Sequence, residues 1–174
     1  MTFTPTMEFA RALPPDFTFP KAEDDYDQRV ILQIQTQGWS PVLVASYQDQ
    51  PQFAFSLGHF YSHQHPEIII MGQLPDIAHQ WLQQLAVKIT QAASPMVPEM
   101  AFDDIAEGIK MKLIPVALAH YPTYFGFANW IYSKLNAPFP AFQLVWSDEA
   151  GRFPWQEDCD PAVKSVQPLL DVYC

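Results

Sequence analysis

Proline is the residue that most limits what this chain can fold into. The sequence has 17 prolines and only 6 glycines in 174 residues. Proline removes a backbone donor and breaks a helix at any interior position. Because the prolines recur along the whole chain, the sequence favours many short elements with stiff joints over a few long helices. This distribution argues against a helical bundle.

Hydrophobic periodicity predicts the elements that lie between the prolines. Residues 39–47 and 52–57 alternate around a turn at 48–51, which predicts a β-hairpin. Further strands are predicted at residues 67–71, at 111–118 and from Phe142 onward. Helices are predicted at residues 25–37, 75–92 and 123–134, with a short last helix from Pro161. Loops are predicted at residues 58–66 and 93–108.

These elements predict an α+β fold with a mostly antiparallel or mixed sheet of about five strands and three to four helices. The length suits one domain. We expect residues 1–24 to form an irregular, proline-rich N-terminal arm and residues 25–174 to form the single domain. Phe9, Phe17 and Phe19 could hold the arm against the body.

The stretch from Phe142 to Trp155 combines a strand, a turn and an aromatic segment. Phe142, Leu144 and Trp146 alternate with polar and smaller residues, and a turn that contains Gly151 follows. Arg152 then lies beside aromatic residues, where its guanidinium could stack on rings and still reach a carboxylate of Asp148 or Glu149. The stretch is either a structural clamp at the end of a sheet or a recognition surface formed by four residues, Trp146, Asp148, Arg152 and Trp155.

The charge balance narrows the classes of partner. The chain has 9 basic and 19 acidic residues, so its formal net charge is −10. Such a chain repels nucleic acid and anionic lipid, because binding phosphate requires a basic surface. No apolar run reaches the roughly 18 residues of a membrane helix, and the first residues do not resemble a signal peptide. We therefore expect a cytoplasmic protein, with Cys159 and Cys174 as free thiols.

Several segments together resemble one bacterial family, known only as domain of unknown function 4262. They follow one another in the same order over roughly residues 31–171: 38–39 (GW), 53–58 (FAFSLG), 65–70 (HPEIII), 126–130 (GFANW), 142–148 (FQLVWSD), 151–155 (GRFPW) and 167–170 (QPLL). The chain departs from the family pattern at His59, where a short apolar residue is usual, and at Gln156, where Glu is usual. The resemblance implies no activity, although some members look like immunity proteins encoded beside toxins.

The sequence contains no complete catalytic signature, but it offers candidates for chemistry. His65 and Glu67 could act as an acid/base pair, and Asp148 and Arg152 could join them around an aromatic cleft. Three histidines in one loop, His59, His63 and His65, are spaced so that several imidazoles could meet one metal ion. Nothing in a loop fixes His59 beside the other two, so we predict no metal and no cofactor.

Binding is the function that the sequence favours. Aromatic residues and carboxylates could form an interface with a basic protein, and the candidates are Tyr124, Trp130, Trp146, Trp155, Glu157 and Asp158. The sequence therefore predicts a small acidic cytosolic protein, of the immunity type, that neutralises a bacterial toxin by direct binding. The alternative is a hydrolase-like enzyme, which requires its polar residues to converge in one pocket rather than to lie on an exposed patch.

Overall fold

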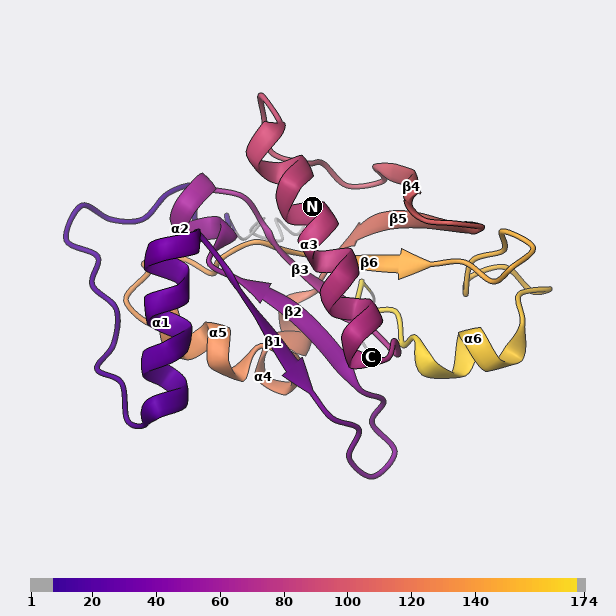
Figure 1. Ribbon diagram of the computed structural model, residues 1–174, viewed down its shortest axis with the longest axis horizontal. Helices are drawn as coiled ribbons and strands as arrows, with labels where there is room; N and C mark the ends of the chain where they lie inside the picture. Colours follow the sequence, from indigo (N-terminus) through magenta and orange to yellow (C-terminus); the bar gives the residue numbers. More distant parts are fainter. Residues whose placement is uncertain (1–7, 172–174) are drawn as a thin grey trace, which may run out of the picture.

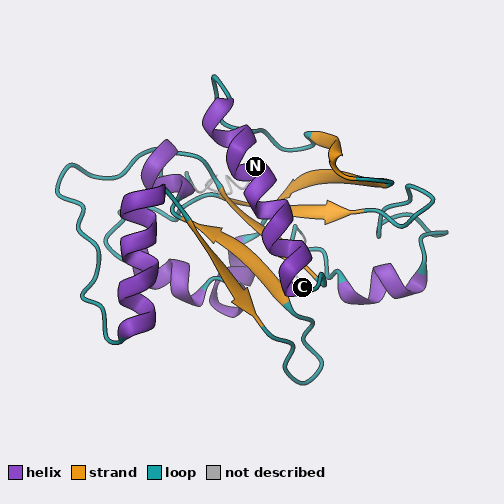
Figure 2. Ribbon diagram, in the orientation of Figure 1, coloured by secondary structure: helices purple, strands orange, loops and turns teal. Residues whose placement is uncertain are grey.

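A mixed β-sheet carries the fold (Figures 1 and 2). The computed structural model describes residues 8–171, and within them six strands form one sheet. The strands are β1 (Ser40–Val44), β2 (Phe53–Leu57), β3 (Glu67–Met71), β4 (Ala101–Ala106), β5 (Ile109–Pro115) and β6 (Ala141–Trp146). The helices are α1 (Asp25–Gln37), α2 (His59–His63), α3 (Pro75–Gln91), the 3₁₀ turn η1 (Leu118–His120), α4 (Tyr121–Tyr124), α5 (Gly126–Ile131) and α6 (Pro161–Val166).

The strand order is β1-β2-β3-β6-β5-β4. Neighbouring strands are antiparallel except for β3 and β6, which are parallel and pair Glu67 with Ala141 at their starts. Because β3 and β6 run in the same direction, both strands begin at one edge of the sheet and finish at the opposite edge. Glu67 lies at the end where both strands begin, and the segment from Ser147 onward lies at the end where β6 finishes.

Each face of the sheet has its own hydrophobic core. On one face α3 packs Trp81, Leu82 and Leu85 against residues such as Ile68 and Leu144. In Figure 1, α3 crosses this face diagonally. On the other face α1, α2, α4 and α5 surround a second core of aromatic and aliphatic side chains, which includes Phe55, Phe60, Phe125, Tyr132 and Phe139. The α+β prediction is therefore confirmed.

Local signals set several helix boundaries as the sequence predicts. The Asp24 side chain accepts a hydrogen bond from the Asp27 N–H at the start of α1, and Gly38 ends this helix with a positive φ of 92°. Asp160 caps α6 by accepting from the Ala162 N–H, with Pro161 in the first turn. The predicted strand at 67–71 and the helix from Pro75 are likewise present.

Three predictions of local structure are wrong. Residues 58–66 are not only a loop but contain α2, and residues 93–108 contain β4, so the sheet has six strands rather than five. β4 is an edge strand with three exposed residues and only one buried residue among its six, so it lacks the alternation that reveals a buried strand. The predicted helix 123–134 is two short helices that meet at Phe125, whose fully buried ring packs against Phe55.

The N-terminal arm contains no helix or strand between residues 8 and 24. The Ala10 N–H donates to the Pro138 carbonyl at 2.8 Å, and Phe17 and Phe19 pack against each other and against Tyr61. Phe9, in contrast, is 38% exposed. Residues 1–7 and Cys174 lie outside the described residues. In the described part of the chain, no helix combines the length and the apolar character that crossing a membrane requires.

Candidate functional site

Glu67 is the first residue of β3 and carries a fully buried carboxylate. Its side chain is 0% exposed. One carboxylate oxygen accepts from the Gly58 N–H at 2.9 Å and the Phe60 N–H at 3.0 Å, and the other accepts from the Ser56 hydroxyl at 2.8 Å. The Tyr132 hydroxyl donates a fourth hydrogen bond at 2.7 Å. Glu67 thus joins β2, the start of α2 and the segment after α5.

Burial controls the protonation of this carboxyl group. Loss of water raises the pKa of Glu67 to about 7, although its four hydrogen bonds act in the opposite direction. Burial also raises the pKa of Tyr132 well above its usual value, and the Glu67 charge adds to this shift. Tyr132 therefore stays protonated and donates, while Glu67 is poised between its two protonation states near neutral pH.

Gly58 allows α2 to begin directly above this carboxylate. Its φ is 119°, and a Cβ atom at this position would lie 2.8 Å from the Gly38 carbonyl oxygen and 2.9 Å from the Trp39 Cα. Any larger residue would therefore clash with backbone atoms. The close approach lets the Gly58 and Phe60 N–H groups both face Glu67, which serves as the cap that α2 lacks in its own sequence.

The three histidines lie around α2 but in different environments. His65 is 2% exposed, its Nδ1 lies 2.7 Å from the Pro66 carbonyl oxygen, and its Nε2 accepts from the Met96 N–H at 3.1 Å. His59 is 1% exposed and stacks on Trp39 with ring centroids 5.3 Å apart. Burial, followed by the neighbouring imidazoles, lowers the pKa of His59 to about 3. His63 is exposed at the end of the same helix.

Asp148 occupies the opposite end of the sheet, just after β6. Its carboxylate accepts from the N–H groups of Ala150, Arg152 and Asp160 at 3.0, 2.8 and 2.9 Å. The N–H groups of Arg152 and Asp160 are the main reason that the pKa of Asp148 is held below its usual value. Asp148 therefore remains ionised and holds the chain from residue 148 to residue 160 in a closed loop.

Arg152 is held by carboxylates, as the sequence predicts. Its Nε lies 3.5 Å from an Asp148 oxygen, and its Nη1 donates to Asp158 at 3.1 Å. The sequence predicts that Arg152 could stack on aromatic rings, but the cation that lies over the Trp155 ring is Lys112, whose Nζ is 5.7 Å from the ring centroid. Trp155 instead stacks on Phe153, with ring centroids 4.6 Å apart.

The segment after β6 borders an open depression of about 500 Å³, which we call the acidic hollow. Its charged residues are Asp148, Glu149, Arg152, Asp158 and Asp160. Its apolar surface comes from Ile109, Trp146 and Val163. The hollow thus combines four carboxylates with one guanidinium and three larger apolar side chains, and its local charge is negative.

The gap where β3 and β6 diverge is filled by the chain itself. The Gln167 side chain accepts from the Trp146 N–H at 3.0 Å and donates to the Trp146 carbonyl at 2.8 Å, as a neighbouring strand would. Gly72 permits this approach, because a Cβ there would lie 2.5 Å from the Val166 carbonyl oxygen. The crevice at the carboxyl ends of parallel strands, a common ligand site, is therefore closed here.

The four aromatic binding candidates do not share one surface. Trp146 is 7% exposed, packs against Trp81, and donates from its indole N–H to the Met71 carbonyl at 2.9 Å. Tyr124 packs edge-on against Phe53, and Trp130 packs against Phe127. Only Trp155, which is 44% exposed, lies in the segment that also carries the exposed Glu157 and Asp158.

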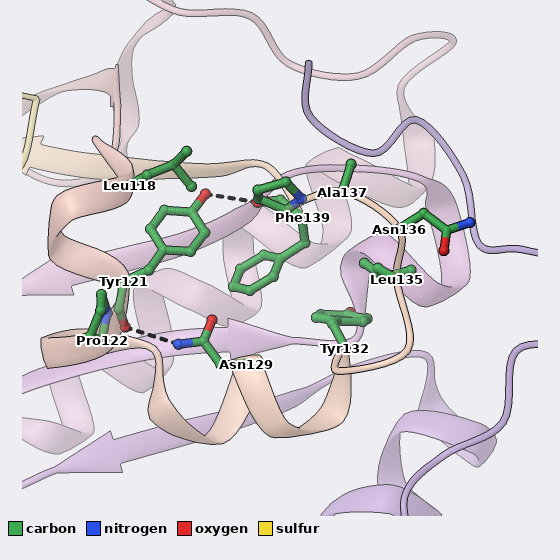
Figure 3. A pocket seen from close by; sticks show the side chains of 10 residues that line it. Leu118, Tyr121, Pro122, Asn129, Tyr132, Leu135, Asn136, Ala137 and Phe139 are labelled. Atoms are coloured by element: carbon green, nitrogen blue, oxygen red, sulfur yellow. Dashed lines mark hydrogen bonds between the residues drawn. The ribbon is translucent and has the colours of Figure 1, made fainter. Parts of the chain in front are cut away.

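A second depression, of about 460 Å³, opens beside α4 and α5 (Figure 3). Tyr121 donates from its hydroxyl to the Phe139 carbonyl at 2.7 Å, and the Asn129 amide donates to the Tyr121 carbonyl at 3.2 Å. Tyr132 is a lining residue, but its hydroxyl donates to Glu67, which does not line the depression. In Figure 3 the Asn136 side chain points away from Tyr121 and Asn129, so the polar groups do not converge on one point.

The four proposed catalytic residues fall into two separate pairs. His65 and Glu67 lie where β3 begins, whereas Asp148 and Arg152 follow the end of β6. Since Asp148 lies seven residues beyond Ala141, which pairs with Glu67, the two carboxylates are separated by roughly 20 Å along the strand direction. The single cluster of His65, Glu67, Asp148 and Arg152 is therefore not formed.

The sequence did not identify three of the residues that complete these sites. Ser56, Tyr132 and Gln167 each bond a distant residue through a side chain, and nothing near them in the sequence signals the partner. Gln156, where the family pattern has Glu, accepts from the Phe153 N–H at 2.8 Å through its amide oxygen. A Glu carboxylate could accept the same bond, so this departure leaves the local structure intact.

Comparison with known proteins gives one match. The model of the family described as Domain of unknown function (DUF4262) matches residues 33–160. The matched region contains six of the seven segments on which the resemblance was based, and residues 167–170 lie beyond it. Neither the curated proteins nor the solved structures include a match to this chain.

Proposed function

Because the chain belongs to the DUF4262 family, whose name implies no activity, we propose from its geometry that it is an acidic cytoplasmic protein that binds a basic protein partner. One observation carries the proposal: the acidic hollow gathers four carboxylates around one guanidinium, and the segment after β6 that supplies most of them also carries the exposed Trp155. The role that best suits such a surface is that of an immunity-type protein, which neutralises a bacterial toxin by direct binding. The net charge of −10 would speed capture of a basic partner.

The hollow suits binding because its charges are held in place before a partner arrives. Asp148 is fixed by three backbone N–H groups, and Asp160 is fixed as the cap of α6. A lysine or arginine side chain that enters the hollow would meet ordered carboxylates, so little conformational entropy would be lost. The Trp155 ring, supported by Phe153, offers the kind of aromatic anchor that dominates many interfaces.

An enzyme of the hydrolase type is the second candidate, and one observation favours it. The pKa of Glu67 is raised to about 7, which is the value that suits a general acid or base at neutral pH. However, Glu67 is 0% exposed and already receives four hydrogen bonds. Its partner Tyr132 lines the depression in Figure 3, but Glu67 itself is not among the lining residues. If protection of cells from the toxin depended on acid/base chemistry at Glu67, the Glu67→Gln variant would fold but fail to protect. A Glu67→Gln variant that folds and still protects would exclude a catalytic role for this residue.

The binding proposal can be tested with the protein encoded by the neighbouring gene. Co-expression should relieve toxicity of that protein, and the purified pair should associate at a rate that falls steeply as salt rises, with a smaller change in the dissociation rate. Reversing charge in Glu149→Lys with Asp158→Lys, at two residues that line the hollow, should slow association and leave the circular dichroism spectrum unchanged. These two residues are exposed, and neither is the cap of α6.

A matched control separates the effect of the hollow on the association rate from the effect of total net charge. Asp16→Lys with Glu23→Lys makes the same change in total charge, but on the exposed N-terminal arm. The control should reduce the association rate much less than the hollow variant does. Equal effects of the two double variants would show that the hollow is not the contact surface, and absence of any binding or protection would refute the immunity role.

A further inference from the structure

Helix α2 places two histidines one turn apart. His59 and His63 are separated by four residues, the spacing that brings two side chains to the same helix face. Their ring centroids are 6.4 Å apart. Two histidines at this spacing on a helix are a recognised arrangement for holding one metal ion between their imidazoles. The sequence could not show this, since residues 58–66 were expected to form a loop.

His59 has a buried nitrogen atom with no hydrogen-bond partner. The residue is 1% exposed, and within residues 8–171 nothing bonds its Nδ1. Buried polar atoms in proteins are nearly always paired, so an unpaired one requires a physical explanation, of which a bound ion is one. The stacked Trp39 ring, tilted by only 20°, holds the imidazole in its orientation.

His65 does not take part as a third ligand. Its Nδ1 is bonded to the Pro66 carbonyl and its Nε2 to the Met96 N–H, so neither nitrogen is available. In agreement, the described part of the chain contains no group of three or more His, Cys, Asp or Glu side chains that could hold a metal ion. A site here therefore has two protein ligands, and water must supply the others.

There is room for water ligands beside the exposed histidine. A cavity of about 160 Å³ is bordered by His63, His65, Thr90 and Ser94. A water molecule occupies about 30 Å³ in the liquid, so this space is large enough for several. The hydroxyl groups of Thr90 and Ser94 offer partners for them. The exposed His63 borders this cavity, which gives an ion access from solvent.

We propose that His59 and His63 form a two-imidazole site for one divalent first-row transition metal ion. Paired imidazoles suit Zn²⁺, Cu²⁺ and Ni²⁺, whereas Mg²⁺ prefers oxygen ligands. Because both ligands belong to α2, a bound ion clamps this short helix in place above Glu67. The site is independent of the acidic hollow, which lies at the other end of the sheet.

The test is calorimetric titration of the full chain with Zn²⁺ after removal of metals by a chelator. We expect saturable binding of about one ion per chain, as at zinc sites of proteins, and no saturable heat with Mg²⁺. His63→Ala should abolish the zinc binding without affecting the fold, because His63 is exposed. His79→Ala, which removes a histidine from α3, is the matched control and should bind zinc as the wild type does.

A second variant tests the buried ligand. His59→Phe keeps a ring against Trp39 but removes both nitrogens, so it should fold, as judged by circular dichroism, and fail to bind zinc. Zinc should also raise the melting temperature of the wild type but not of either variant. The site is refuted if the wild type shows no saturable binding or if His63→Ala binds normally. Equal weakening by His79→Ala would mean adventitious surface binding only.

Discussion

At each end of the β3–β6 pair a carboxylate accepts several hydrogen bonds, but the surroundings of the two carboxylates differ. At one end Glu67 accepts from two backbone N–H groups and two hydroxyl groups. At the other end Asp148 accepts from three backbone N–H groups and lies beside a guanidinium. Each carboxylate is a hub that joins segments distant in the sequence, yet burial raises the pKa of Glu67 while the N–H groups lower that of Asp148.

The number of hydrogen-bond donors does not explain why the pKa of Glu67 is raised and that of Asp148 is lowered. Glu67 has at least as many hydrogen bonds as Asp148, but it is 0% exposed within an apolar core, where loss of water penalises the charged form. Asp148 borders the open acidic hollow and keeps a nearby positive charge. The Glu67 end is therefore sealed within the core, whereas the Asp148 end borders an open, negatively charged hollow.

The largest effect should come from removing the sealed carboxylate. Glu67→Ala leaves two buried N–H groups and two hydroxyl groups without their acceptor, and each such loss costs about 1–3 kcal/mol. We therefore expect the free energy of unfolding to fall by roughly 3 kcal/mol or more in urea denaturation. Glu149→Ala, which removes an exposed carboxylate at the open end, should change it by less than about 0.5 kcal/mol. Similar losses in the two variants would contradict the contrast.

The acid side of the stability profile should depend on His59. Its folded-state pKa of about 3 lies below the ordinary 6.5, so the unfolded chain takes up a proton that the folded chain does not. Stability from this group is present above pH 6.5 and is lost as pH falls toward 3, at up to about 1.4 kcal/mol per pH unit. His59→Phe should flatten this decline in a chemical denaturation series, and an unchanged decline in that variant would contradict the prediction.

Glu67 and Asp148 should contribute to the pH profile with opposite signs. The folded-state pKa of Glu67, about 7, lies above the ordinary 4.5, so its contribution is complete below pH 4.5 and is lost as pH rises through 7. The free energy of unfolding of the wild type, relative to Glu67→Gln, should therefore increase as pH falls from about 8 to about 5.

For Asp148 the folded-state pKa lies below the ordinary 3.8, so its contribution is present above pH 3.8 and is lost as pH falls through the folded-state value. The advantage of the wild type over Asp148→Asn should accordingly shrink on acidification. Both differences are measured by urea denaturation across the same pH series. Slopes of the same sign for the two residues would show that burial does not set the contrast between the two ends.

The smallest effect is expected at Arg152. Its side chain is 40% exposed, and its ion pairs with Asp148 and Asp158 are correspondingly screened by water. Arg152→Ala should lower the free energy of unfolding by at most about 1 kcal/mol and lower the melting temperature slightly, since some packing is also lost. High salt should reduce the difference between the variant and the wild type. A loss as large as that of Glu67→Ala would mean that the open end also carries the fold.

Local signals in the sequence account for much of the framework. Asp24 with Gly38 set the ends of α1, and Asp160 with Pro161 set the start of α6, because caps act through neighbouring backbone groups. The alternating hairpin and the apolar segment 67–71 likewise appear as β1, β2 and β3. The carboxylate partner of Arg152 was predictable too, since Asp148 lies across one turn.

Tertiary structure alone decided which residues share a site. Glu67 meets Tyr132 across 65 positions, and Trp146 meets Gln167 across 21, distances over which no periodicity or cap carries information. The parallel pairing of β3 with β6 separated His65 and Glu67 from Asp148 and Arg152. It also sealed Glu67 within an apolar core and placed Asp148, itself only 6% exposed, at the border of an open hollow. Burial depends on which elements cover each end of the sheet, whereas a sequence specifies only the residue type.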